Sequence, residues 1–329
     1  MKRYVWLALL SIGLLFTSIQ PGGAMDVQNL RIATQPMGSS WYVYGGVIGS
    51  VLRSDFPSGS KIDILPYAGA AANYNLVSDG KAELGLGFPV TGTWAYRGEV
   101  VFNKKMTNLR GLVGGLDEYY AGIVATKKSK ITSLSDVAGK KMSIHLATMT
   151  KGSIGEILNG QVMGAVDASF DTIRSLGGRV THTSYGNITK MLVDGQADLH
   201  MHVVTVGHPN MSEIAITADV VFLDIPPEAL KKLSAMGWTA ATLPANTFKG
   251  QTKPIATIGT TTNLFTTDKF PEDVAYAVTK SICEHSKTIA TGHAGLKTFN
   301  PAKAWKPENV GLPLHPGAEK YYREKGWMK

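Results

Sequence analysis

Strand-like and helix-like segments alternate along this chain with short connections, in two separate series. The spacing of apolar residues predicts the first series as strand, helix, strand, helix and strand, at residues 30–33, from about 43, 62–67, 70–79 and 83–88. A second series has strands at 120–126, 141–144 and 198–204 and a helix from about 152. Such alternation favours right-handed crossovers and mostly parallel sheets, so we expect an α/β fold whose ligands bind beyond the carboxyl ends of the strands.

The first 24 residues have the pattern of a cleaved export signal. Lys2 and Arg3 precede an almost wholly apolar run at 5–19, and the small residues Gly22, Gly23 and Ala24 follow it. We expect cleavage near Ala24, a periplasmic location and no membrane-spanning helix in the mature protein. Residues 25–329 are too many for one small core, which predicts two domains.

The net charge limits the classes of partner, and the cysteine content limits how the fold can be stabilised. The formal net charge is +8, which favours anionic ligands, but the lysines are scattered in short pairs behind an export signal, so a nucleic-acid partner is not expected. The single cysteine, Cys283, cannot form an intrachain disulfide. The chain must therefore be stabilised by its core, with Cys283 as a small buried residue.

The junction after the first strand is a candidate anion seat. Here the residues Pro36, Met37, Gly38, Ser39 and Ser40 separate a strand from a helix, and the first N–H groups of a helix have no partner within it. The alternative is that one of the serines is a plain N-cap.

The histidines of the second series are candidates for a site of another kind. His200 and His202 alternate along one strand and so point to one face, and His145 and His208 lie nearby in the sequence. The spacing fits no standard zinc site, and we expect neither a metal nor another cofactor. These histidines either line a ligand cleft or lie in the core, and His202 is the better cleft candidate. Serine-lysine pairs at 58/61 and 78/81 lack accompanying catalytic motifs, so no enzyme activity is expected.

Several segments together resemble one family over essentially the whole mature chain. They are TQPMGSSWYVYGG, YAGAAANYNLVSDGKAELGLG, LSDVAGKKMSI, LVDGQADLHMHVVTVGHPN and HPGAEKYYREKG. In this order they resemble the TAXI group, the extracytoplasmic solute receptors of tripartite ATP-independent periplasmic (TRAP) transporters. The resemblance implies a periplasmic binding protein fold, in which two α/β lobes joined by a hinge close on a ligand and then dock on the TRAP membrane subunits.

This resemblance also implies the domain division. We expect residues 25–118 and about 250–329 in the first lobe and residues 119 to about 249 in the second. Within the last third, the pattern predicts a strand at 254–264 and helices at 271–290 and 316–325. We expect the protein to act as a monomer.

Matching positions carry the family's ligand contacts onto this chain. Residues 38–42, which are Gly38, Ser39, Ser40, Trp41 and Tyr42, stand where the family has a Gly-Gly-Thr-Tyr-Tyr run that faces the ligand. Asn73 matches an asparagine at the start of the second helix. Tyr120 lies where the chain first crosses between the lobes and is a further candidate.

Departures from the family pattern concern the polarity of the ligand. Ala70 replaces a usual serine and Phe88 aligns with a usual glutamine, which favours a ligand with a larger apolar or aromatic part. In the second lobe a usual Gly-Ser-Gly-Thr run reads Thr148, Met149, Thr150, Lys151, Gly152 and Ser153. Lys151 either neutralises a ligand carboxylate or sulfonate or simply points to water.

These features predict a periplasmic receptor for a small organic anion, a carboxylate with an apolar or aromatic part, that delivers its ligand to a TRAP permease. Two alternatives stay open. One is a sensory receptor that presents the ligand to a signalling kinase, and the other, more distant, is an exported hydrolase.

Overall fold

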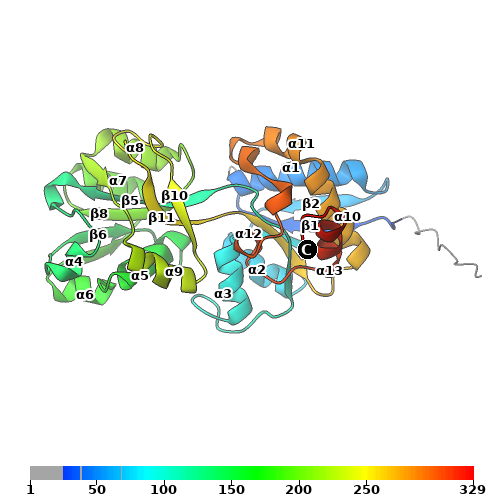
Figure 1. Ribbon diagram of the computed structural model, residues 1–329, viewed down its shortest axis with the longest axis horizontal. Coiled ribbons are helices and arrows are strands. Elements are labelled where there is room, and N and C mark those ends of the chain that lie inside the picture. The colour runs from blue at the N-terminus through cyan, green and yellow to red at the C-terminus, as the bar shows by residue number, and fades with distance from the viewer. Residues whose placement is uncertain (1–24, 38, 68) are drawn as a thin grey trace, which may run out of the picture.

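The computed structural model describes residues 25–37, 39–67 and 69–329, which form two lobes, each built around its own β-sheet (Figure 1). The expected signal segment and Gly38 lie outside the described residues. No helix within those ranges combines the length and the apolar character that crossing a membrane requires.

The first sheet has the strand order β2-β1-β3-β12-β4. The strands are β1 (Asn29–Ala33), β2 (Lys61–Leu65), β3 (Leu84–Gly87), β4 (Leu109–Val113) and β12 (Asn263–Thr267). β1 is parallel to β2 and β3, whereas β12 is antiparallel to both β3 and β4. The predicted strand-helix alternation of the first series is present, and one late strand of opposite direction is inserted into its sheet.

Helices cover both faces of the first sheet (Figure 1). They are α1 (Ser40–Asp55), α2 (Ala70–Ser78), α3 (Pro89–Arg97), α10 (Glu272–Glu284), α11 (Ser286–Gly292), α12 (Pro307–Val310) and α13 (Pro316–Glu324). α1 buries Tyr44, Ile48 and Leu52, whose spacing puts them on one face of the helix. Glycine at position 45 lets this face approach the sheet closely, because a Cβ atom there would lie 2.6 Å from the Thr34 methyl carbon.

The second sheet has the order β10-β11-β5-β8-β6-β7, with β9 paired to β5. Its strands are β5 (Tyr119–Thr126), β6 (His145–Thr148), β7 (Arg179–His182), β8 (Leu199–Val204), β9 (Val220–Phe222), β10 (Thr239–Leu243) and β11 (Ile255–Thr260). The prediction of a mostly parallel sheet is wrong here, because only the β6–β7 and β6–β8 pairs are parallel. β5 leads away from the first lobe and pairs antiparallel with β8, β9 and β11.

Helices also cover the second sheet on both faces: α7 (Tyr185–Val193) and α8 (Pro209–Thr217) lie on one side, and α4 (Asp136–Gly139), α5 (Ile154–Ala165), α6 (Phe170–Ser175) and α9 (Pro227–Ala235) on the other (Figure 1). The strand expected at 141–144 is β6, four residues later. Lys141 has a φ of 52°, a turn conformation that does not start a strand.

The chain crosses between the sheets twice. The first crossing lies between β4 and β5, and the second lies at Thr261 and Thr262, between β11 and β12. The stretch 254–264, expected as one strand, is therefore two strands in different sheets. The second sheet extends to Thr260, past the return expected near residue 250. The Leu116 N–H donates to the Thr262 carbonyl at 3.1 Å, so the two crossing segments are bonded to each other.

Candidate functional site

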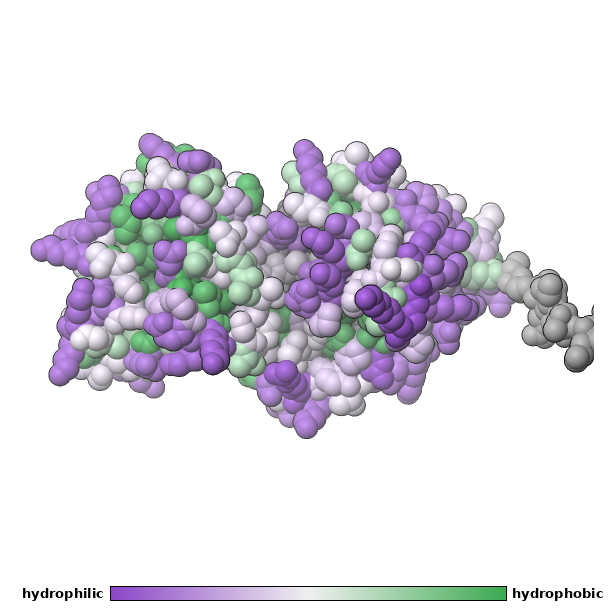
Figure 2. Space-filling model, viewed as in Figure 1, coloured by the Kyte–Doolittle hydropathy of each residue, from purple (hydrophilic) through white to green (hydrophobic). Residues whose placement is uncertain are grey.

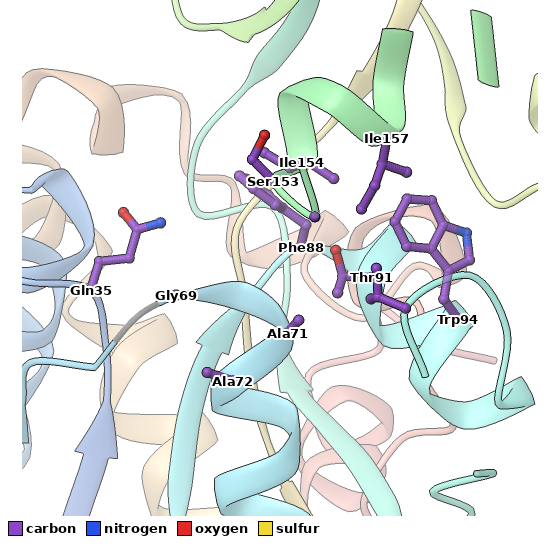
Figure 3. Close-up of a pocket in the computed structure, with 12 residues that line it drawn as sticks. Gln35, Gly69, Ala71, Ala72, Phe88, Thr91, Trp94, Ser153, Ile154 and Ile157 are labelled. Atoms are coloured by element: carbon purple, nitrogen blue, oxygen red, sulfur yellow. The ribbon is translucent and has the colours of Figure 1, made fainter. Parts of the chain in front are cut away.

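A cavity of about 390 Å³ lies between the lobes and has walls from both of them (Figure 3). The first lobe contributes residues around the starts of α2 and α3, and the second lobe contributes Gly152, Ser153, Ile154 and Ile157 around the start of α5. In the space-filling view, pale and green residues lie on the second-lobe border of the narrow region between the lobes, and purple residues lie along its first-lobe border (Figure 2). The size is within the range of small-molecule sites.

The first-lobe wall is built from two helix starts. α2 begins after Gly69, whose φ of 116° favours glycine, and α3 begins at Pro89, directly after β3. Both helices have nine residues, and neither has an acidic residue in its first turn. Their first N–H groups lack partners within the helix and lie at the positive end of its dipole. Gly69, Ala71 and Ala72 at α2 and Phe88 and Thr91 at α3 line the cavity.

Thr91 is the buried polar side chain of this wall. It is only 2% exposed, and its hydroxyl has no hydrogen-bond partner among the described residues. In Figure 3 the Thr91 oxygen points toward the α5 side of the cavity. A buried hydroxyl without a partner is costly, so a ligand group that bonds to it would gain affinity.

Aromatic side chains form the apolar part of the first-lobe wall. Phe88 packs edge-on against Trp41, with ring centroids 4.8 Å apart, and against Tyr119 at 5.0 Å. Trp94 from α3 also lines the cavity and packs against Trp238 of the second lobe at 5.9 Å. Phe88 is 5% and Trp94 1% exposed, so the two rings form a packed apolar base of this wall beside the polar helix starts.

The second-lobe wall is the first turn of α5. Ser153 caps this helix by accepting a hydrogen bond from the Glu156 N–H at 3.2 Å. The Glu156 carboxylate accepts from the Gly152 N–H at 3.3 Å, and it lies 3.6 Å from the His182 Nε2 atom. The positive end of α5 thus already holds a carboxylate of this chain.

The predicted anion seat after the first strand is a capped helix start. The Ser39 hydroxyl accepts from the Tyr42 N–H at 3.2 Å, as in the N-cap alternative. Trp41 is buried, and its indole N–H donates to the Thr262 hydroxyl at 2.9 Å. Met37 is 74% exposed. None of the described residues from Met37 to Tyr42 is among those that line the cavity.

Two further first-lobe candidates lie at α2. The Asn73 amide group donates to the backbone carbonyls of Ala33 and Leu86, at 3.2 and 2.8 Å, and so joins β1 to β3. Its Oδ1 atom is buried without a partner among the described residues. Ala70 is the first residue of α2, and its side chain is not described.

The second-lobe candidates are spread around the cavity. Thr148 is buried at the end of β6, whereas Thr150 and Lys151 are exposed. Lys151 is next to Gly152 in the sequence but does not line the cavity. Tyr120 donates to a Glu118 carboxylate oxygen at 2.8 Å and borders a different hollow beside the hinge.

His200, His202 and His208 do come together, around Tyr185. The ring centroids of the three histidines lie 5.5, 4.9 and 5.6 Å from that of Tyr185, respectively. Burial lowers the pKa of His200 to about 4 and the pKa of His202 to about 3, so both imidazoles are neutral at pH 7. In the described part of the chain, no group of three His, Cys, Asp or Glu residues is placed to hold a metal ion.

The two segments that cross between the lobes, which form the hinge, contain a buried acid. Asp117 is fully buried, and its carboxylate accepts from the Thr262 N–H at 2.7 Å. Burial raises the pKa of Asp117 to about 6, against the opposing effect of the Thr262 hydrogen bond.

Sequence reasoning missed Gln35 and Thr91 in the first lobe and Ile154 and Ile157 in the second as cavity residues, and left Trp94 open between a stacking face near the lobe junction and a core aromatic. For Thr91 a signal existed, because Pro89 directly after a predicted strand favours a helix start. No local signal distinguishes Ile154 and Ile157 from core residues of an amphipathic helix.

Comparison with known proteins places the chain in a family and a fold. The model of a family described as NMT1-like matches residues 32–326. Among solved structures, MatC from Rhodopseudomonas palustris with bound malate is 16% identical, with 92% of this chain and 98% of that chain covered and a TM-score of 0.52. A TctC solute binding protein from Polaromonas, without ligand, is 13% identical, with 82% and 86% covered and a TM-score of 0.52.

PhnD1 from Prochlorococcus marinus, in complex with methylphosphonate, is 9% identical, with 92% and 99% covered and a TM-score of 0.52. At these identities the likenesses show the fold alone, which is the two-lobed α/β fold of periplasmic binding proteins.

Proposed function

The chain belongs to the NMT1-like family, and on that premise we propose that it is a periplasmic solute-binding protein that takes a small organic anion into the cavity between its lobes. The observation that carries this proposal is the cavity itself, which has walls from both lobes. A ligand that contacts both walls favours the closed arrangement of the lobes, because it binds that arrangement more tightly than an open one.

Anion binding is supported by the first-lobe wall. The starts of α2 and α3 and the Thr91 hydroxyl offer hydrogen-bond donors to a carboxylate or sulfonate. The apolar part of the ligand has Phe88 and Trp94 beside these donors. Among the ligand contacts predicted from the family pattern, we favour Phe88 most, because it lines the cavity.

We further propose delivery of the ligand to TRAP membrane subunits, as the TAXI resemblance implies. The contacts inferred from that resemblance at Tyr42 and Thr150, and the cleft contact inferred for His202 from its place in the strand, remain part of the proposal, and single substitutions there test them. Export after cleavage near Ala24 belongs to the same proposal.

Thermal-shift screening of residues 25–329 against aliphatic and aromatic carboxylates, dicarboxylates, amino acids and sulfonates tests this function. A ligand present at 100 times its dissociation constant adds about 2.7 kcal/mol to the free energy of unfolding. We expect such a shift for at least one organic anion. No shift with any of them, together with hydrolysis of an ester panel, would overturn the proposal in favour of an exported hydrolase.

A further inference from the structure

The two walls of the cavity differ in what they offer a charged group. On the first-lobe wall, two nine-residue helices start without an acidic residue in their first turns, and the hydroxyl of the 2%-exposed Thr91 is unpartnered among the described residues. An anionic group seated there gains hydrogen bonds and a favourable interaction with both helix dipoles.

The second-lobe wall, in contrast, is unfavourable for an anionic group. Glu156 already occupies the positive end of α5 through its hydrogen bond to the Gly152 N–H. Ile154 and Ile157 line the cavity from the same helix (Figure 3). A second anionic group of a ligand would lie against Ile154 and Ile157 and near the Glu156 carboxylate, which does not line the cavity but is bonded to the lining Gly152. The aliphatic contacts and the like charge both make its position unfavourable.

Charged side chains that could compensate a second anionic group do not line the cavity. The lining residues among those described are all uncharged. Of the two charged residues beside Gly152, Lys151 is exposed, whereas the half-buried Glu156 is bonded to the Gly152 N–H. An apolar chain, in contrast, gains by covering Ile154 and Ile157.

We propose that Glu156 is a specificity-determining residue, and that the site takes organic anions with one charged group and an apolar remainder while rejecting dianions. This inference rests on the proposed function. The charged group binds at the starts of α2 and α3 beside Thr91, and the apolar part lies against Ile154 and Ile157.

Hexanoate and adipate are matched probes, because both have six carbons and adipate has one carboxylate more. Isothermal titration calorimetry of residues 25–329 at pH 7.5 compares their dissociation constants. We expect hexanoate to bind at least about tenfold more tightly than adipate. In Glu156→Gln the affinity for adipate rises by about tenfold, whereas that for hexanoate changes by less than about threefold. Glu213→Gln, at an exposed position of α8, is the matched control and leaves both affinities unchanged.

A second variant tests the seat of the charged group. Thr91→Val keeps the shape of the side chain and removes its hydroxyl, so the affinity for hexanoate falls by about three- to tenfold. The melting temperature of the ligand-free protein stays the same or rises, because the buried hydroxyl has no partner among the described residues. Adipate that binds the wild type as tightly as hexanoate, or an unchanged hexanoate-to-adipate ratio in Glu156→Gln, overturns the inference and leaves the proposed function standing. Failure of every acid in the thermal-shift panel counts against the proposed function itself.

Discussion

The Trp94 indole N–H donates a hydrogen bond to the Met236 carbonyl at 2.7 Å. Trp94 lies on α3 of the first lobe, and Met236 ends α9 of the second, so this bond connects the two lobes. Because the Trp94 ring also lines the cavity, one side chain both contacts the proposed ligand position and joins the lobes.

Removal of this bond should weaken ligand binding. Trp94→Phe keeps an aromatic ring in the wall but loses the N–H donor, so the arrangement with joined lobes loses about 0.5–1.5 kcal/mol. We expect the dissociation constant for a ligand found by the screen to rise by about two- to tenfold, measured by calorimetry. Trp305→Phe is a matched control, because the Trp305 indole N–H donates to Ala302 within the first lobe. Equal effects of the two substitutions would contradict a role of Trp94 in joining the lobes.

Asp117 should make the protein less stable as the pH rises. Its pKa is about 6 in the folded protein and lower in the unfolded chain, so the folded state binds the proton more tightly. The stability that this proton contributes is present at about pH 4 and is lost as the pH rises through 6. Asp117→Asn keeps an acceptor for the Thr262 N–H and removes this titration.

Urea unfolding at pH 4.5 and 7.5 checks this prediction. The free energy of unfolding of Asp117→Asn, relative to the wild type, should increase with pH by roughly 2 kcal/mol over this range. Asp194→Asn, at an exposed position, serves as the control. A difference between Asp117→Asn and the wild type that stays constant with pH would show that Asp117 is ionised throughout.

His202, in the histidine cluster, should make the protein less stable as the pH falls. The pKa of His202 is lowered to about 3 by burial, so its contribution to stability is complete above pH 6.5 and is lost as the pH falls below it. Between pH 7.5 and 5 the wild type should therefore lose about 1–2 kcal/mol more than His202→Gln. Chemical unfolding at the two pH values measures this. Parallel loss of stability in both proteins would mean that His202 binds no additional proton on unfolding.

Lys151 tests where the charge of the ligand lies. Its side chain is exposed and does not line the cavity, so Lys151→Ala should change the dissociation constant by less than about twofold. Calorimetry with the same ligand gives the answer. A tenfold loss would instead place the ligand charge at Lys151, as the departure from the family pattern allowed.

Sequence patterns predicted the helices and strands that depend only on residues close together in the chain. The helix that buries Tyr44, Ile48 and Leu52 was predictable from spacing, and its start at Ser39 follows from the capping hydroxyl. The stretch 254–264 was not predictable as two strands, since its break at Thr261 and Thr262 depends on the crossing between the lobes. Spacing along the chain carries no signal for such a tertiary effect.

The residues of the candidate site also differ in how far the sequence could predict them. Phe88 was predicted through the family pattern, and the structure places it in the cavity wall. Glu156 was not predicted, because its effect on the site arises from a hydrogen bond to Gly152 and from the position of α5 against the first lobe. Sequence spacing predicts the helix on which such a residue lies but not the cavity that the helix start faces.

The most direct test of the central claim is a calorimetric titration of a cavity-filling variant with the ligand identified by the screen. Ala71→Trp places a large side chain in the cavity wall at α2, and Ala256→Trp adds the same side chain at an exposed position of β11. We predict one-to-one binding to the wild type and to Ala256→Trp, and at least about a hundredfold weaker binding to Ala71→Trp with its melting temperature preserved. Undiminished binding to a folded Ala71→Trp would contradict the claim that the cavity between the lobes is the ligand site.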